Sequence, residues 1–303
     1  INERGEEINT HNLSSRLLWP DHPLGAPTIG YLNTIANFTE EDLRGHLKSH
    51  YVPSNAVIVV AGDVTPNAAF AAAEEAFALW QGPSSSPTTF VSAAQSGPQS
   101  VFVEDSDSQV HLQIAFRGFA RADRRIMALR LLRRVLCGGG SSRLHLSLRE
   151  RLGMVYSVDA SISAYEETGA FAIELSTAPD NLLRTIEETI KEIKLLVTEP
   201  IGSVELQRIK QGYFYDLEYS RDSTYEMQVR YGWGELMEMV RDVEEDKAEA
   251  EGVDSEFLKM VARELFAPEN VNLVAVGSWK KGDRKKVAKL LDDYERDFSL
   301  ITS

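Results

Sequence analysis

From about residue 100 onward, the order of apolar and polar positions predicts strands first, then helices, then a closing strand. Period-two alternation marks strands with one covered face, and apolar residues spaced three or four apart mark helices. The predicted strands are residues 100–103, 110–116, 156–163, 170–177 and 271–276. The predicted helices are residues 122–136, a short helix from Ser141 or Ser142 to Arg151, 179–198, 204–222, 224–239, one that Asp254 caps and that ends near Phe266, and 284–296. Strands followed by helices over one face indicate an α+β sandwich built on an antiparallel sheet.

Part of the chain is repeated at an offset of 215 residues. The tripeptide at 53–55, the apolar run at 56–61 and Gly62 recur as the tripeptide at 268–270, the run at 271–276 and Gly277. The same offset places Thr39, which can cap a helix together with Asp42, over the cap residue Asp254. A shared cap, proline turn, strand and terminal glycine predicts two homologous domains.

The segment between the two copies has the composition of an exposed linker. Residues 81–99 contain three prolines and many serines. We therefore predict that residues 1–80 are the C-terminal part of a first domain, residues 81–99 a linker, and residues 100–303 a complete second domain. The first copy has only 62 residues up to its glycine, so about 115 residues of the first domain are expected to be missing.

Composition narrows the class of protein. The chain has 303 residues, 43% hydrophobic content and a formal net charge of −14, which predicts a soluble globular protein without a nucleic-acid partner. No apolar run approaches the roughly 18 residues of a membrane span. The acidic first residues lack the basic start and apolar stretch of a signal peptide, so none is expected at Ile1, and the compartment stays open. The single cysteine, Cys137, is expected to be a small buried apolar residue.

Three motifs could carry chemistry without reference to any family, and each lacks an essential group. His46 and His50 are spaced to share a helix face and one zinc ion, but the residues between them include no glutamate to act as a base. The glycine-rich stretch 138–143 lacks the lysine of a phosphate-binding loop. No serine lies in a G-x-S-x-G turn.

A longer motif decides the interpretation. Residues 137–157 read C-G-G-G-S-S-R-L-H-L-S-L-R-E-R-L-G-M-V-Y-S, which resembles the second-domain signature of the pitrilysin/insulinase family of zinc peptidases, the family of the mitochondrial processing peptidase. Further matches lie at 18–25 (L-W-P-D-H-P-L-G), 38–39 (F-T), 51–55 (Y-V-P-S-N) and 60–63 (V-A-G-D). The resemblance implies two homologous peptidase-like sandwich domains, of which the first is truncated.

The resemblance also implies a division of roles between the domains. The family's active domain carries the zinc motif H-x-x-E-H, which is absent from this sequence. A glutamate near the amino end, Glu7, stands where the family places its late zinc ligand, although the spacing from Glu3 is short. In the second domain the family uses an arginine and a tyrosine to contact the peptide, and these correspond to Arg149 and Tyr156. Otherwise, Arg149 would pair within its own helix, and Tyr156 would be a half-buried strand residue.

Two functions remain open at this point. In the first, the chain is a fragment or subunit of a zinc endopeptidase: Arg149 binds the peptide, Tyr156 binds it and acts in catalysis, and zinc belongs to the complete enzyme rather than to this chain alone. Its expected partners are a peptide substrate and a zinc-bearing homologous half or subunit, or a second copy in a homodimer. In the second, the chain is a catalytically inactive structural or peptide-binding subunit of a processing peptidase or a larger complex. Only the first function requires Arg149 and Tyr156.

Overall fold

The computed structural model describes residues 8–84 and 95–302, which fall into two compact units. Unit 1 comprises Ile1–Leu32, Phe90–Lys210 and Gly252–Ser303, and unit 2 comprises Asn33–Thr89 and Gln211–Glu251. Residues 85–94 of the predicted linker, and the proposed ligand Glu7, lie outside the described residues. The division into domains at residues 80 and 100 stays a prediction.

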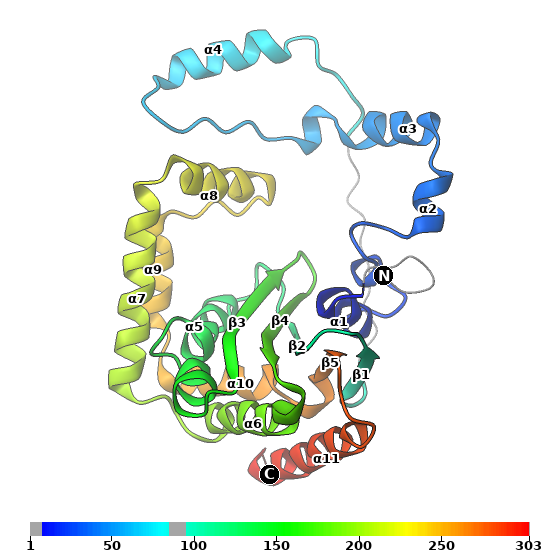
Figure 1. The fold of residues 1–303 in the computed structure, drawn as a ribbon. Helices are drawn as coiled ribbons and strands as arrows, with labels where there is room; N and C mark the ends of the chain where they lie inside the picture. Colours follow the sequence, from blue (N-terminus) through cyan, green and yellow to red (C-terminus); the bar gives the residue numbers. More distant parts are fainter. Residues whose placement is uncertain (1–7, 85–94, 303) are drawn as a thin grey trace. The chain divides into compact units, whose positions relative to one another are not determined.

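Unit 1 is built on one five-stranded sheet (Figure 1). The strands are β1 (Gln99–Glu104), β2 (Val110–Gly118), β3 (Val155–Ala164), β4 (Gly169–Thr177) and β5 (Asn272–Gly277), in the order β1-β5-β2-β4-β3. All the strands predicted from residue 100 onward are present, which confirms the α+β class. The sheet is antiparallel except at β1, which runs parallel to β5. The sequence did not predict this pair, because β5 returns to the sheet only after a long helical segment.

Helices cover one face of this sheet. They are α5 (Ile126–Cys137), α6 (Leu182–Thr198), α10 (Ser255–Leu265) and α11 (Asp283–Thr302). Three aromatic rings fill the space beneath them: Phe116 and Phe171 come from neighbouring strands, and Phe266 follows α10. The Phe266 ring meets the other two edge-to-face, with centroids 4.9 and 5.7 Å away, which is a favoured packing geometry for aromatic pairs.

The opposite face carries the helix α1 (Thr10–Leu18). Leu18 and Trp19 pack against small residues of β2 and β4, namely Ala115, Ala170 and Ala172. The alternation of side chains along a strand explains the arrangement, since these alanines point away from the phenylalanines of the helix-covered face. The Arg117 side chain fixes the end of α1 by donating its Nε–H to the Leu18 carbonyl at 2.7 Å.

Unit 2 is helical in its described residues. It contains most of α2 (Leu32–Asn37), and α3 (Glu40–His50), α4 (Pro66–Phe77), α8 (Thr224–Leu236) and most of α9 (Val243–Gly252), together with the end of α7 (Ser203–Arg221). The predicted cap of α3 is confirmed: Asp42 N–H donates to Thr39 Oγ1 at 3.2 Å, and Thr39 N–H donates to Asp42 Oδ2 at 2.9 Å. This reciprocal pair is a capping box.

The 215-residue repeat is visible in local geometry. Helices α3 and α10 begin and end at equivalent positions, and each is followed by a one-turn 3₁₀ helix, Pro53–Asn55 and Pro268–Asn270 respectively. The glycines that end the two copies, Gly62 and Gly277, both have positive φ, at 144° and 137°. Both therefore use a conformation that favours glycine.

The two copies differ in what surrounds them. Residues 56–61, predicted as a strand, are not a strand in this structure, whereas their counterpart is the fully buried β5. Leu43 on α3 is 58% exposed, and its counterpart Leu258 on α10 is 0% exposed. The strand prediction is wrong here for a physical reason: an apolar strand needs hydrogen-bonding neighbours, and none lies beside residues 56–61 in the described part of the chain.

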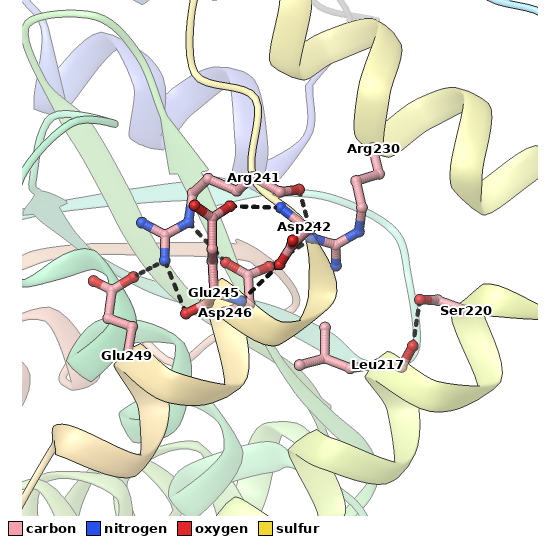
Figure 2. A network of polar contacts seen from close by, with 8 residues as sticks. All are labelled: Leu217, Ser220, Arg230, Arg241, Asp242, Glu245, Asp246 and Glu249. Atoms are coloured by element: carbon pink, nitrogen blue, oxygen red, sulfur yellow. Dashed lines mark hydrogen bonds and ion pairs between the residues drawn. The ribbon is translucent and has the colours of Figure 1, made fainter.

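Helix α9 was not predicted, and a network of charges anchors it (Figure 2). The buried Asp246 carboxylate accepts hydrogen bonds from Arg230 at 2.7 Å and from Arg241 at 3.0 Å. Two guanidinium groups thus compensate the carboxylate for its lost hydration. Asp242 and Glu245 bond each other's backbone N–H groups, both at 2.8 Å. The D-x-x-E spacing of a capping box was therefore the sequence signal for this helix.

Candidate functional site

The signature segment begins with a glycine turn and a short π-helix, η3 (His145–Arg151). Gly139 has φ of +113°, which allows the chain to reverse after α5. The predicted serine cap is wrong, because Ser142 Oγ donates to the Gly139 carbonyl at 2.6 Å and the helix has no side-chain cap. Such π-helical turns are rare and occur frequently at functional sites.

An ion pair fixes the beginning of this segment. Arg143 donates from Nε to Glu205 Oε1 at 3.0 Å and from a terminal nitrogen to Glu205 Oε2 at 2.7 Å. Both side chains are largely shielded from solvent. This two-point contact joins the signature loop to the first turn of α7 and favours a single orientation.

Gly153 ends η3, as predicted. It has φ of +59°, and its N–H donates to the Arg149 carbonyl at 3.1 Å. A left-handed residue directly after a helix is the usual way to close its last turn. The chain then enters β3, which carries Tyr156.

A β-bulge lies at the start of β3. Val155 pairs with Thr177 and Val158 pairs with Leu175, so three steps along β3 match two steps along β4. The extra residue interrupts the alternation of faces. Val155 and Val158 are buried, while Tyr156 and the residue after it are both exposed. The bulge therefore turns the Tyr156 side chain outward.

Arg149 and Tyr156 lie close together on these two irregular elements. The guanidinium carbon of Arg149 is 5.6 Å from the centroid of the Tyr156 ring, within the range of a cation–π interaction. Tyr156 is 81% exposed, so the alternative of a half-buried strand residue is wrong. The other half of that alternative is met, because Arg149 pairs within its own helix: its Nε lies 3.7 Å from a Glu150 carboxylate oxygen, while 46% of the Arg149 side chain stays exposed.

Both groups are therefore available to a ligand. A guanidinium offers several fixed N–H donors, and a phenol offers one O–H donor on a rigid ring. Among the described residues, the Tyr156 hydroxyl has no hydrogen-bond partner. The pair thus presents hydrogen-bond donors at the surface.

The described residues do not fit a zinc site. His46 and His50 lie together on α3, with ring centroids 4.5 Å apart, but two imidazoles fall short of the three or four ligands that zinc takes. Within residues 8–84 and 95–302, no three histidine, cysteine or acidic side chains come together as a metal site would require. That this chain alone binds no zinc stays a prediction, as does the role of Glu7.

Two expectations from composition concern Cys137 and membrane-spanning helices. Cys137 is 5% exposed, which confirms that it is a buried apolar residue. Burial raises the pKa of its thiol to about 12, and the charge of Asp159 adds to the shift. Across the described part of the chain, no helix combines the length and the apolarity that crossing a bilayer demands.

One group beside the site was missed by sequence reasoning. The Thr177 hydroxyl, buried at the end of β4, donates to the Met154 carbonyl at 2.9 Å, two residues before Tyr156. A threonine at the end of an apolar strand is ordinary in sequence, so no pattern marks it.

Comparison with known proteins places the chain among peptidase-related sequences. Residues 37–213, more than half of the chain, match the family described as the peptidase M16 inactive domain. A protein of Bacillus subtilis (strain 168), described as uncharacterized zinc protease YmxG, is 30% identical over 86% of this chain and 63% of its own length. The chain thus spans less than two thirds of that relative.

Solved structures share the fold. A peptidase M16 inactive domain from Pseudomonas fluorescens aligns with a TM-score of 0.79 and 21% identity, covering 88% of this chain and 64% of the other. A chain of Complex III2 from Candida albicans aligns with a TM-score of 0.74 and 17% identity, covering 88% and 65%. The solved structures share the fold, and the family model matches more than half of the sequence. The chain therefore belongs to the peptidase M16 family and carries its inactive domain.

Proposed function

We propose that this chain is the substrate-contacting half of a zinc-dependent endopeptidase. The observation that carries the proposal is the exposed Arg149 and Tyr156 pair, held 5.6 Å apart by a π-helix and a β-bulge. Two interruptions of regular helix and strand geometry within a few residues cost stability. Such irregular elements recur next to active sites, where they aim side chains.

The two residues have different tasks in this proposal. Arg149 donates hydrogen bonds to a carbonyl of the bound peptide and holds it in place. Tyr156 donates its phenol hydrogen to the oxygen that becomes negative when the scissile carbonyl is attacked. A donor directed at that oxygen stabilises the transition state more than the ground state.

The partner in this proposal is a zinc-bearing half, either on the same longer polypeptide or on a separate subunit. Residues 33–84 support this proposal, because they have almost no core in the described part of the chain. Val52 is the only buried hydrophobic residue among them. The repeat supports it further, since β5 lies between two strands and its counterpart at 56–61 has neither. A zinc-bearing half that supplies those strands would give α3 and α4 a core.

The kinetics of two variants test the proposal in the complete, zinc-loaded enzyme. Tyr156→Phe removes only the hydroxyl and should lower kcat by roughly 10² to 10³, the usual loss for one oxyanion donor. Arg149→Ala should mainly raise KM, because its hydrogen bonds hold the peptide in ground and transition states alike.

Arg151→Ala provides the control. Arg151 lies on the same π-helix and approaches Glu192 rather than Tyr156, so its loss should leave kcat and KM nearly unchanged. If Tyr156→Phe and Arg149→Ala both leave cleavage intact, the proposal is wrong. The chain would then be a structural subunit, the second function that its sequence allows.

A further inference from the structure

The peptide group of Met154 joins the two irregular elements of the site. Its N–H donates to the Leu148 carbonyl of η3 at 2.9 Å. Its carbonyl accepts the hydrogen bond from Thr177 Oγ1 at 2.9 Å. Met154 therefore connects the turn that carries Arg149 with the strand pair that carries Tyr156.

The Thr177 hydroxyl is itself held in place. Thr185 Oγ1 of α6 lies 3.2 Å from Thr177 Oγ1, and both side chains are buried. A hydroxyl carries one hydrogen. Because Thr177 gives its hydrogen to Met154, Thr185 must be the donor of this second bond. The chain of hydrogen bonds runs from α6 through β4 to the backbone before Tyr156.

This bond lies where the register of β3 changes. Thr177 pairs with Val155, and the extra residue of the bulge follows directly. A bulge can move along a strand if nothing fixes it, and a shift of one residue moves a side chain to the other face. We infer that Thr177 is a positioning residue, whose bond to Met154 fixes the bulge so that Tyr156 points outward beside Arg149.

Kinetics on the complete zinc-loaded enzyme test the consequence for Tyr156, a step that rests on the proposed function. Thr177→Val keeps the shape and removes the hydroxyl, and it should lower kcat on the order of tenfold, since small displacements of a catalytic group are costly. Thr177→Ser should restore kcat. In a Tyr156→Phe background, Thr177→Val should have no further effect, because the two act through one group.

Thr189→Val is the matched control. Thr189 is a buried threonine on α6 whose hydroxyl donates to the Thr185 carbonyl of its own helix at 2.8 Å. Among the described residues, no hydrogen bond joins it to Met154, so its loss should leave kcat unchanged. If Thr177→Val and Thr189→Val lower kcat equally, the effect is one of general stability and the inference is wrong.

Hydrogen exchange on this chain alone tests the anchoring without any activity. Amides of residues 153–157 should exchange roughly fivefold faster or more in Thr177→Val, and at the wild-type rate in Thr189→Val. Unchanged exchange in Thr177→Val overturns the inference, whatever the kinetics. Faster exchange combined with an inert Tyr156→Phe would support the anchoring and reject the proposed function instead. An equal loss of kcat from Thr177→Val with and without the Tyr156 hydroxyl would also overturn the inference.

Discussion

Asn55 and Asn270 stand at equivalent positions of the two copies and make the same hydrogen bond. Each side-chain amide donates to the carbonyl five residues earlier, at 3.0 Å for Asn55 and 2.8 Å for Asn270. Only Asn270 also bonds the backbone of β2, accepting from the Arg117 N–H at 3.0 Å and donating to the Arg117 carbonyl at 2.8 Å. Among the described residues, no such strand lies beside Asn55.

This difference predicts unequal effects of the same substitution. Asn270→Ala should lower the free energy of unfolding by about 1–3 kcal/mol, because it leaves backbone groups of β2 without their partner. Asn55→Ala should stay within about 0.5 kcal/mol in this chain. Urea unfolding of both variants measures this, and equal losses would mean that the first copy is as well packed as the second.

The first copy should also open more readily. Residues 33–84 expose apolar side chains such as Phe38 and Leu47 and contain no strand in the structure, so their amides should exchange faster than those of β2 and β4. Mass spectrometry of deuterated protein resolves the two regions. Adding the zinc-bearing half should slow exchange in residues 33–84, and equal protection before the addition would contradict the account.

The burial of the Cys137 thiol predicts that the stability of the folded chain depends on pH. The unfolded thiol ionises near its ordinary pKa of 9.0, whereas burial holds the folded pKa near 12. The folded state therefore binds more protons between these values, and stability should fall as the pH rises above about 9. Cys137→Ala should reduce that slope. At pH 8, thiol reagents should modify Cys137 only as fast as the chain opens. Rapid labelling of the folded protein would show that the Cys137 thiol is accessible and would contradict this prediction.

The isolated chain should contain no stoichiometric zinc. His46 and His50 are two ligands, and a stable tetrahedral site needs more protein ligands than two. Elemental analysis after dialysis against trace zinc measures the content. One tightly bound zinc per chain would overturn this account of the site.

Much of unit 1 could be predicted because local signals and the fold agree. Strands β2 and β4 form where they were predicted, the Asp254 carboxylate accepts the N–H of Phe257 in the first turn of α10, and Gly153 ends η3. The expected single covered face of β2 was wrong, because most of β2 and β4 is buried and α1 packs on the second face. The prediction failed at residues 56–61, where the apolar pattern is that of a buried strand. A strand depends on its neighbours for hydrogen bonds, and those neighbours are not fixed by the strand's own sequence.

The site was predictable only in part. The positions of Arg149 and Tyr156 came from the resemblance to a family motif, but the π-helix and the β-bulge that bring them together did not. The bulge adds one residue to β3, and groups that contact these irregular elements lie far along the chain. Thr177, for example, contacts Met154 from 23 positions away.

Reconstituted cleavage is the most direct test of the central claim, that this chain contacts the substrate of a zinc peptidase. A quenched fluorescent peptide would be incubated with the chain alone, with the zinc-bearing half alone, and with both. We predict cleavage only when both are present, and its reduction by roughly 10² to 10³ when the chain carries Tyr156→Phe. Cleavage by the chain alone, or equal cleavage by the zinc-bearing half with and without it, would contradict the account.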